Sequence, residues 1–241
     1  MTAIQTFNLT RKFKKRTAVD SLNLSIEKGE LFALLGLNGA GKTTCIKMLC
    51  CLLSPTSGDA RLLGDSILEH PEAVKQKINI SPQETAVAPN LSVKENLELI
   101  AGIYGSNKSE ARSKAEDIMQ SFGLSDRSKD RAKNLSGGLQ RRLSIAMALI
   151  SNPEIAFLDE PTLGLDVVAR RELWKVLTGL KGKITMVLTT HYLEEAEALS
   201  DRIGVMHAGR LKALGTAEQL KQETGKKSFE DAFIALAGTE G

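Results

Sequence analysis

The chain has 241 residues, 42% of them hydrophobic, which is enough for one large domain with a packed core and a sizeable insertion. Uninterrupted apolar runs such as Leu31 to Leu35 and Ile145 to Ile150 are far shorter than the roughly 20 residues that cross a bilayer, so the sequence excludes a membrane-spanning helix. The net charge of +3 is mild, and aromatic residues make up only 4%, which excludes the stacking platform of single-strand nucleic-acid binders.

The N-terminal part alternates short β-rich runs with turn signals. Strands are predicted around Ile4 to Leu9 and Leu22 to Ile26, and a turn at Lys28-Gly29 precedes the apolar run Leu31 to Leu35, which is typical of a buried strand. Basic residues gather between the first two runs, from Arg11 to Arg16. This patch fits a solvated turn near a triphosphate, and it also fits a contact with nucleic acid or lipid head groups.

The stretch from Gly36 to Thr43 fits G-x-x-x-x-G-K-[ST] at every fixed position and follows the buried strand directly. Its glycines let successive N–H groups point into one concavity that cradles phosphates. Lys42 adds a positive charge there, Thr43 is placed to ligate Mg²⁺, and residues from Lys42 to about Leu53 are predicted to form a helix. A chance Gly-rich turn is the alternative. The residues expected to bind ATP are Gly36, Leu37, Asn38, Gly39, Ala40, Gly41, Lys42, Thr43 and Thr44.

Three cysteines, Cys45, Cys50 and Cys51, lie on or just after this helix. Neither a second cysteine cluster nor a histidine at metal-ligand spacing accompanies them. We therefore interpret them as small core residues rather than as a disulfide framework or a zinc site.

The middle of the chain changes from strand to helical patterning. Pro55 and Gly58 mark a turn, after which a strand pair is predicted around 59–63 and 78–80. Helical periodicity follows from Glu84 to Ile150, with helices predicted over 92–104, 109–122 and 137–151. Ser92 with Glu95 three residues on is the capping-box arrangement. A helical insertion is thus expected to interrupt an α/β domain.

The sheet is predicted to resume with Ile155 to Leu158 and Ile184 to Thr189, two apolar runs of the length expected of central parallel strands. A helix over 167–180 joins them. The remaining elements are predicted to be a hairpin, 202–207 with 210–214, and closing helices over 217–223 and 229–236.

Two carboxylates, Asp159 and Glu160, end the strand that begins at Ile155. Ligands of open α/β sheets sit at that end of a strand. In a phosphate-loop ATPase, Asp159 would hold Mg²⁺ and Glu160 would polarise the attacking water as a general base. The alternative is a carboxylate pair that simply ends a strand at the surface.

A second anion site is predicted where the loop Leu135-Ser136-Gly137-Gly138 becomes a helix. This pattern resembles the signature of the ATP-binding-cassette (ABC) ATPases. Gln83 at a strand end, Leu163-Gly164-Leu165-Asp166 after the carboxylates and His191 after two threonines agree with it. The resemblance covers essentially residues 1–223, and it rests on several motifs in the right order.

The resemblance implies an α/β fold, a P-loop NTPase core of ABC ATPase type with an antiparallel β subdomain and an inserted helical subdomain. The core would comprise 1–83 and 152–223, the helical signature subdomain 84–151, and a C-terminal helical tail 224–241. It also implies that two such domains pair head to tail, so that ATP lies between the phosphate loop of one and the signature of the other.

Residue roles carry over position by position from the resemblance. Glu160, His191 and Gln83 would be catalytic, and Thr43, Gln83 and Asp159 would hold Mg²⁺. Phe13 would stack on adenine, although it also fits a core position, and Asp166 would line the dimer interface. The signature acting in trans would be Leu135, Ser136, Gly137, Gly138 and Gln140.

The expected function is that of an ATPase subunit that drives export by a separate transmembrane permease, which docks around 83–96. The chain would sit on the cytoplasmic face of the cell membrane, paired with a second nucleotide-binding subunit in a homodimer or heterodimer, and no nucleic acid is expected. A soluble ABC-type ATPase that acts on nucleic acid or ribosomes is the alternative. A metabolite kinase would share only the phosphate loop.

Overall fold

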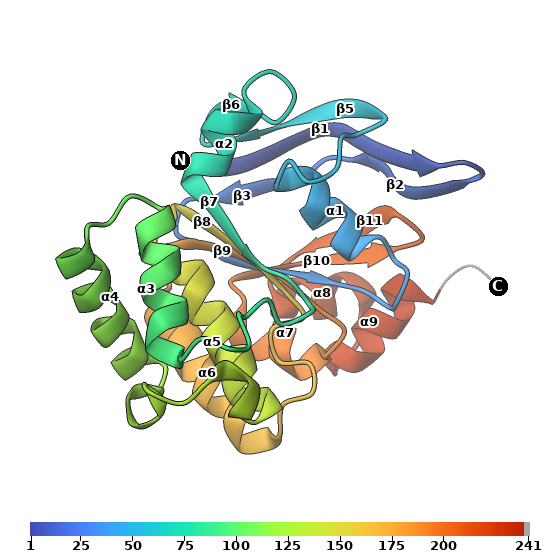
Figure 1. Cartoon of the computed structure of the whole chain (residues 1–241). Helices are drawn as coiled ribbons and strands as arrows, with labels where there is room; N and C mark the ends of the chain where they lie inside the picture. The colour runs from blue at the N-terminus through green and yellow to red at the C-terminus, as the bar shows by residue number, and fades with distance from the viewer. Residues whose placement is uncertain (239–241) are drawn as a thin grey trace.

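The computed structural model of the chain describes residues 1–238, and it consists of two β-sheets with helices between and below them (Figure 1). Helix α1 (Lys42–Leu49) lies between the sheets, whereas the helices from α3 to α9 gather on the opposite face of the larger sheet. This arrangement gives the chain two hydrophobic cores, one on each face of the larger sheet.

Within residues 1–238 the strand order of the larger sheet is β11-β10-β4-β9-β8-β7. Neighbouring strands are parallel, except that β10 and β11 form an antiparallel hairpin at one edge. Its strands are β4 (Leu31–Leu35), β7 (Ile78–Ser81), β8 (Ile155–Asp159), β9 (Thr185–Thr190), β10 (Arg202–His207) and β11 (Arg210–Gly215). Because β4, β7, β8 and β9 run in the same direction, the loops that follow them meet at one edge of the sheet.

The second sheet is antiparallel. Its order is β2-β1-β5-β6, with β3 also paired to β1. Its strands are β1 (Thr2–Phe13), β2 (Arg16–Leu22), β3 (Ser25–Glu27), β5 (Ser57–Leu62) and β6 (Asp65–Ser66). The β1–β2 hairpin turns through Lys14 and Lys15, so the basic patch of the sequence is the tip of this hairpin.

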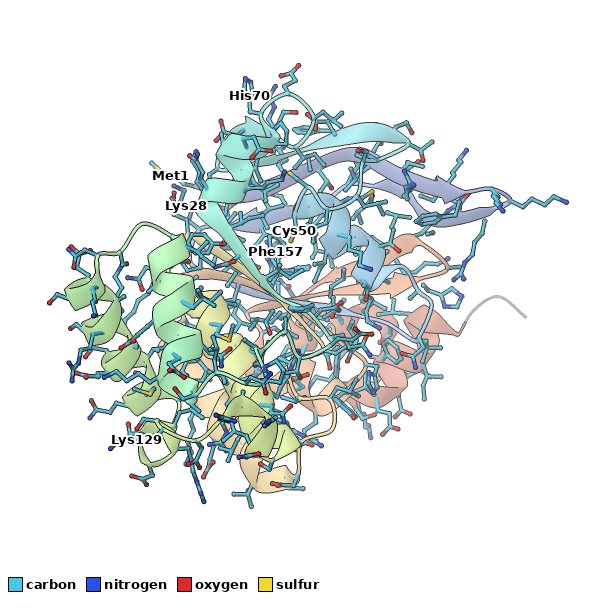
Figure 2. All side chains as sticks on the ribbon, viewed as in Figure 1. Met1, Lys28, Cys50, His70, Lys129 and Phe157 are labelled. Atoms are coloured by element: carbon cyan, nitrogen blue, oxygen red, sulfur yellow. The ribbon has the colours of Figure 1, made fainter. Side chains whose placement is uncertain are left out.

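Successive residues of the central strands face the two cores alternately, because side chains alternate between the two faces of a β-strand. In β8, Ile155 and Phe157 face the core around α1, whereas Ala156 and Leu158 face the helical core. Figure 2 places Phe157 beside Cys50 in the interior between the two sheets. All five residues of β4 and of β8 are buried, so both strands are covered on both faces.

The middle segment of the chain, within the described residues 84–151, contains three α-helices and two 3₁₀ turns, joined by short loops. They are α3 (Val93–Ile103), α4 (Lys108–Ser121), η1 (Ser125–Arg127), η2 (Ala132–Asn134) and α5 (Gly137–Leu149). Helix α5 contacts α3 as well as β7 and β8, so it joins the helical segment to the sheet. The other helices are α2 (Pro71–Lys77), α6 (Val167–Gly179), α7 (Leu193–Leu199), α8 (Ala217–Thr224) and α9 (Phe229–Ala237).

Most predicted elements are confirmed, but three expectations need correction. The runs 59–63 and 78–80 are not a pair: β5 pairs with β1 and β6, whereas β7 pairs with β8. Helix α1 ends at Leu49 rather than near Leu53, and the predicted strand 22–26 divides between β2 and β3. The elements α2, β6, α7 and most of β2 were not predicted. The end of the predicted tail, residues 239–241, lies outside the described residues.

The cysteine interpretation holds for two of the three side chains. Cys45 and Cys50 are buried and free, whereas Cys51 is only partly buried. Burial raises the pKa of the Cys45 thiol to about 12 and also raises that of Cys50. These two therefore act as small apolar core residues. Within residues 1–238, no helix combines the length and the apolar content that a membrane span requires.

Candidate functional site

A pocket of about 680 Å³ opens at the edge of the sheet where β4, β7, β8 and β9 end. Its walls come from the β1–β2 hairpin, from the loop that precedes α1 together with the first turn of that helix, and from the segments that follow β7, β8 and β9. The residues that line it are Phe13, Arg16, Ala18, Asn38, Gly39, Ala40, Gly41, Lys42, Thr43, Thr44, Gln83, Glu160, Leu163 and His191. Segments far apart in the sequence therefore share one cavity.

The loop between β4 and α1 presents a row of free backbone donors to this pocket. Within the described part of the chain, no protein oxygen accepts from the amides of residues 38, 39 and 41–44, whereas Ala40 donates to Leu37 at 3.1 Å. Gly41 makes the close approach possible: its φ is 106°, and a Cβ there would lie 2.2 Å from the carbonyl oxygen of Ala18. A concavity of N–H groups at a helix N-terminus fits an anionic ligand such as phosphate.

Lys42 and Glu160 form a buried ion pair on the floor of the pocket. The distance from Lys42 Nζ to Glu160 Oε1 is 3.4 Å, and Nζ also donates to the carbonyl of Gly36 at 2.6 Å. His191 approaches the other carboxylate oxygen, with Nδ1 2.8 Å from Oε2. The three side chains predicted to meet phosphate and water therefore lie in one line, joined by an ion pair and a hydrogen bond.

Asp159 lies beside the phosphate loop. Thr43 Oγ1 donates to its Oδ1 at 3.2 Å, and the Thr189 hydroxyl donates to the same oxygen. Residues 1–238 contain no cluster of three or more His, Cys, Asp or Glu side chains able to hold a metal. The available ligands are thus a hydroxyl, a carboxylate and the amide of Gln83. This donor set fits Mg²⁺, which is commonly held by one or two carboxylates together with substrate phosphates.

Glu160 has a left-handed backbone, with φ of 51° in a residue that is not glycine. Its amide donates to the carbonyl of Thr189 at 3.1 Å and to that residue's hydroxyl at 3.0 Å. Such a conformation is uncommon and persists only where the surrounding contacts hold it. It turns the chain sharply at the end of β8, and the carboxylate lines the pocket.

The residues that line the mouth of the pocket differ in part from those that the sequence predicted. Phe13 is 43% exposed and lines the pocket, so it is not a core residue. The Cζ atom of Arg11 lies 4.6 Å from the centre of its ring. Gly36 and Leu37 do not line the cavity within the described chain; their carbonyls accept from Lys42 instead. Arg16 was not predicted as a site residue, yet it lines the pocket and donates to Gly39 at 2.9 Å.

Two of the predicted signature residues, Ser136 and Gly138, line a separate hollow of about 270 Å³, whereas Leu135, Gly137 and Gln140 are not among its lining residues within 1–238. Ser136 caps α5 by accepting from the amide of Leu139 at 3.4 Å, and Asp166 caps α6 by accepting from Ala169 at 2.8 Å. Gln140 points elsewhere, because its amide donates to the carbonyl of Leu135. The residues that line the hollow are Ser136, Gly138, Leu139, Arg142, Gly164, Leu165, Asp166, Val168, Ala169 and Glu172.

Two of the missed residues carried no signal of their own in the sequence. Thr189 reads as the end of an apolar strand, yet its hydroxyl donates to Asp159. Arg16 reads as one member of a basic run. Their contacts are made with residues more than twenty positions away, and only the pairing of β8 with β9 and the course of the β1–β2 hairpin bring them to the site.

Residues 19–163 match the family model described as ABC transporter. A daunorubicin resistance ATP-binding protein from Streptomyces coeruleorubidus is 40% identical over the whole of this chain, which spans 76% of that relative. A linearmycin resistance ATP-binding protein from Bacillus subtilis is 39% identical over 92% of this chain and 72% of its own length. The human phospholipid-transporting ATPase ABCA3 is 40% identical over 88% of this chain, which spans only 12% of that protein.

Solved structures agree with these relatives. An ATP-binding subunit of an ABC transporter superposes with a TM-score of 0.87 at 28% identity, covering 97% of this chain and 99% of its own. A dimeric ATP-binding cassette bound to ADP and phosphate, in a post-hydrolysis state, superposes with a TM-score of 0.82 at 26% identity, covering 88% and 98%. With its phosphate loop, carboxylate pair and signature in place, this chain belongs to the ABC transporter family as one of its ATP-binding, ATP-hydrolysing cassettes.

Proposed function

We propose that the pocket binds ATP together with Mg²⁺ and hydrolyses the terminal phosphate when two cassettes close head to tail, and that this cycle drives export through a separate transmembrane permease. The observation that carries the catalytic part is the line Lys42, Glu160 and His191. It puts a cation, a carboxylate and an imidazole on the floor of a pocket whose rim is a row of free amides. Transfer of a phosphoryl group to water needs such groups, because it depends on positioning and on electrostatic stabilisation of the phosphate oxygens.

Glu160 is the general base in this proposal. Its carboxylate takes the proton of the attacking water, and His191 holds one carboxylate oxygen in place through the 2.8 Å contact. Lys42 exchanges its bonds to the loop carbonyls for bonds to the β- and γ-phosphates. Phe13 offers its exposed ring to the adenine at the mouth of the pocket. Arg16 and the free amides of residues 38, 39 and 41–44 hold the phosphates.

Mg²⁺ would be held by Thr43, Asp159 and Gln83, the last of which follows β7 and lines the pocket. A bound Mg²⁺ supplies electrostatic stabilisation of the charge that develops on the phosphate oxygens. The 3.2 Å contact between Thr43 and Asp159 supports this assignment, because it brings two oxygen ligands together next to the loop.

The second cassette supplies the signature. None of Leu135, Ser136, Gly137 and Gly138 lines the pocket of its own chain within the described residues, so the free amides at the start of α5 are available to a nucleotide held by a partner. The dimeric cassette among the structural relatives supports this pairing. Asp166 lies in the same hollow as Ser136 and Gly138 and would contribute to the interface.

The permease would dock around 83–96, next to Gln83, and hold the cassette on the cytoplasmic face of the membrane. Relatives that are named for resistance to daunorubicin and linearmycin support a drug-like cargo. No nucleic-acid substrate is proposed. A pull-down of the tagged chain from detergent-solubilised membranes tests this part: a multi-span partner supports it, and recovery only with ribosomes or nucleic acid contradicts it.

Replacing Glu160 with Gln tests the catalytic part. Without a base, we expect ATP turnover to fall roughly 10²- to 10⁴-fold, whereas binding of a fluorescent ATP analogue persists because the amide cradle is untouched. Glu116→Gln on the exposed face of α4 is the matched control and keeps full turnover. Full turnover by the Glu160 variant would show that another group acts as base.

A further inference from the structure

The side chain of Arg141, in the second turn of α5, is buried to 3% exposure although it is charged. No Asp or Glu carboxylate of residues 1–238 forms an ion pair with it. Taking a cation out of water is costly, and burial lowers the pKa of this guanidinium from its usual value. A side chain retained under those conditions needs a full set of acceptors, and Arg141 has them.

Its first set of acceptors is the backbone around the proposed general base. Nη2 donates to the carbonyls of Asp159 at 2.6 Å and Glu160 at 3.1 Å, and Nε donates to the carbonyl of Pro161 at 3.0 Å. These carbonyls lie on both sides of the left-handed Glu160. The guanidinium is planar and its donors are fixed relative to one another, so it holds the three carbonyls in one geometry.

Its second set of acceptors is the segment that follows β7. Nη1 donates to the carbonyl of Pro82 and, at 3.3 Å, to that of Gln83. The same side chain therefore joins three separate parts of the chain: the helix that begins at Ser136, the turn of Glu160 and the segment of Gln83. Arg142, the next residue, makes no such link, because its Nη2 pairs with Glu172 on α6.

We propose that Arg141 is a positioning residue that fixes the turn of Glu160 and the segment of Gln83 relative to the signature helix. The inference rests on the proposed function, in which Ser136 and Gly138 contact the nucleotide of the partner cassette. A shift of α5 on that contact moves the guanidinium, and with it the carbonyls next to Glu160. In this way, closure on the partner's nucleotide adjusts the base of the chain's own site.

A double-mutant cycle with Arg141→Gln and Glu160→Gln tests the proposal. The turnover of each variant is expressed per ATP-binding site, and the number of sites is titrated with a fluorescent ATP analogue. A variant that is partly unfolded is therefore not mistaken for one with a lower kcat. Because a misplacement of about 1 Å can cost roughly 100-fold, we expect Arg141→Gln to lower kcat about 10- to 100-fold with KM changed less than about threefold. In the Glu160→Gln background, single turnovers of radiolabelled ATP should be no slower with the second substitution than without it.

Arg141→Lys is the second variant, and Arg112→Gln on the exposed face of α4 controls for loss of an arginine charge. A lysine keeps the charge but cannot reach both segments, so we expect its kcat to stay low. The proposal is overturned by a wild-type kcat in either Arg141 variant, or by an equal loss in the two Glu160 backgrounds. Full turnover by Glu160→Gln alone would instead overturn the proposed function.

Discussion

Among the pocket residues with a positive φ, Gly41 and Glu160 have φ of 106° and 51°. The loop requires a glycine at the first position, because a Cβ there would lie 2.2 Å from the carbonyl oxygen of Ala18. At the second position the proposed function requires the carboxylate of Glu160, and hydrogen bonds to Thr189 and from Arg141 offset the backbone strain there.

Gly41→Ala should therefore destabilise the protein by at least about 1–2 kcal/mol and weaken ATP binding, since the loop must shift to relieve both the strain and the clash. Gly102→Ala is the control: that glycine lies near the end of α3 with open space around it, and alanine there should stabilise by up to about 1 kcal/mol. Urea denaturation of both variants checks the opposite signs. Equal effects would mean that the loop tolerates a side chain.

Glu195 is a fully buried carboxyl that accepts from Trp174 Nε1 at 3.3 Å. Burial raises its pKa, and the nearby hydroxyls of Thr190 and Thr162 offset part of that effect. A pKa raised in the folded state means that the native chain binds this proton more tightly than the unfolded chain. Its contribution to stability is therefore complete below the unfolded pKa and is lost as pH rises through the folded pKa.

Glu195→Gln removes this titration while keeping the shape and the acceptor for Trp174. We expect its free energy of unfolding, relative to the wild type, to rise as the pH is raised from about 4 to about 8. Trp174 is the only tryptophan of the chain, so its fluorescence follows unfolding in urea at each pH. Glu197→Gln, on the same helix but exposed, should show no such slope. Parallel pH profiles for Glu195→Gln and the wild type would refute the prediction.

At the scale of elements, local signals in the sequence were reliable. The capping box of Ser92 and Glu95 is formed at the start of α3: Ser92 Oγ accepts from the Glu95 amide at 3.2 Å, and the Glu95 carboxylate accepts from the Ser92 amide at 2.7 Å. The phosphate loop likewise lies between a buried strand and a helix, as its motif predicts. Both features involve residues only a few positions apart.

Ser92→Ala should cost about 1 kcal/mol of stability through loss of this cap. The measurement is the free energy of unfolding in urea, with Ser109→Ala as a control because Ser109 lies inside the first turn of α4 and is not its capping residue. ATP binding should persist in both variants, since neither serine lines the pocket. An unchanged free energy for Ser92→Ala would mean that solvent replaces the cap.

Contacts between distant segments could not be predicted from the sequence. The pairing of β7 with β8 rather than with β5 is decided by the core between the sheets, which no local pattern describes. Helix α2 has a single buried residue, Val74, so its periodicity is too weak to recognise. Arg141 and Arg142 look alike as neighbours in a sequence, and only packing shows that the first is buried against the turn of Glu160.

At the scale of the whole molecule, the pocket and the signature hollow share no lining residue within residues 1–238. In the proposed function these are two half-sites, and each is completed by the partner chain rather than by the same molecule. Under that proposal a head-to-tail pair would satisfy both half-sites at once, and a closed two-fold pair would leave no site open for a third chain. The proposal also implies that the stability of the pair depends on nucleotide, because the triphosphate would contribute part of the contact surface.

Glu160→Gln with Mg²⁺ and ATP should consequently form a dimer, detected by light scattering as a doubling of mass that reverses when ATP is removed. Gly138→Glu added to it should abolish the dimer but not ATP binding by the single chain. A Cβ at Gly138 makes only ordinary contacts, at 3.5 Å with Leu165 and 3.9 Å with Ala169, so the fold accepts the residue, while its charge repels the partner's triphosphate. Gly179→Glu, on the exposed end of α6 with open space around it, adds the same charge away from the hollow and should leave the dimer intact. A dimer that survives Gly138→Glu would exclude the signature hollow as the surface that meets the partner's nucleotide.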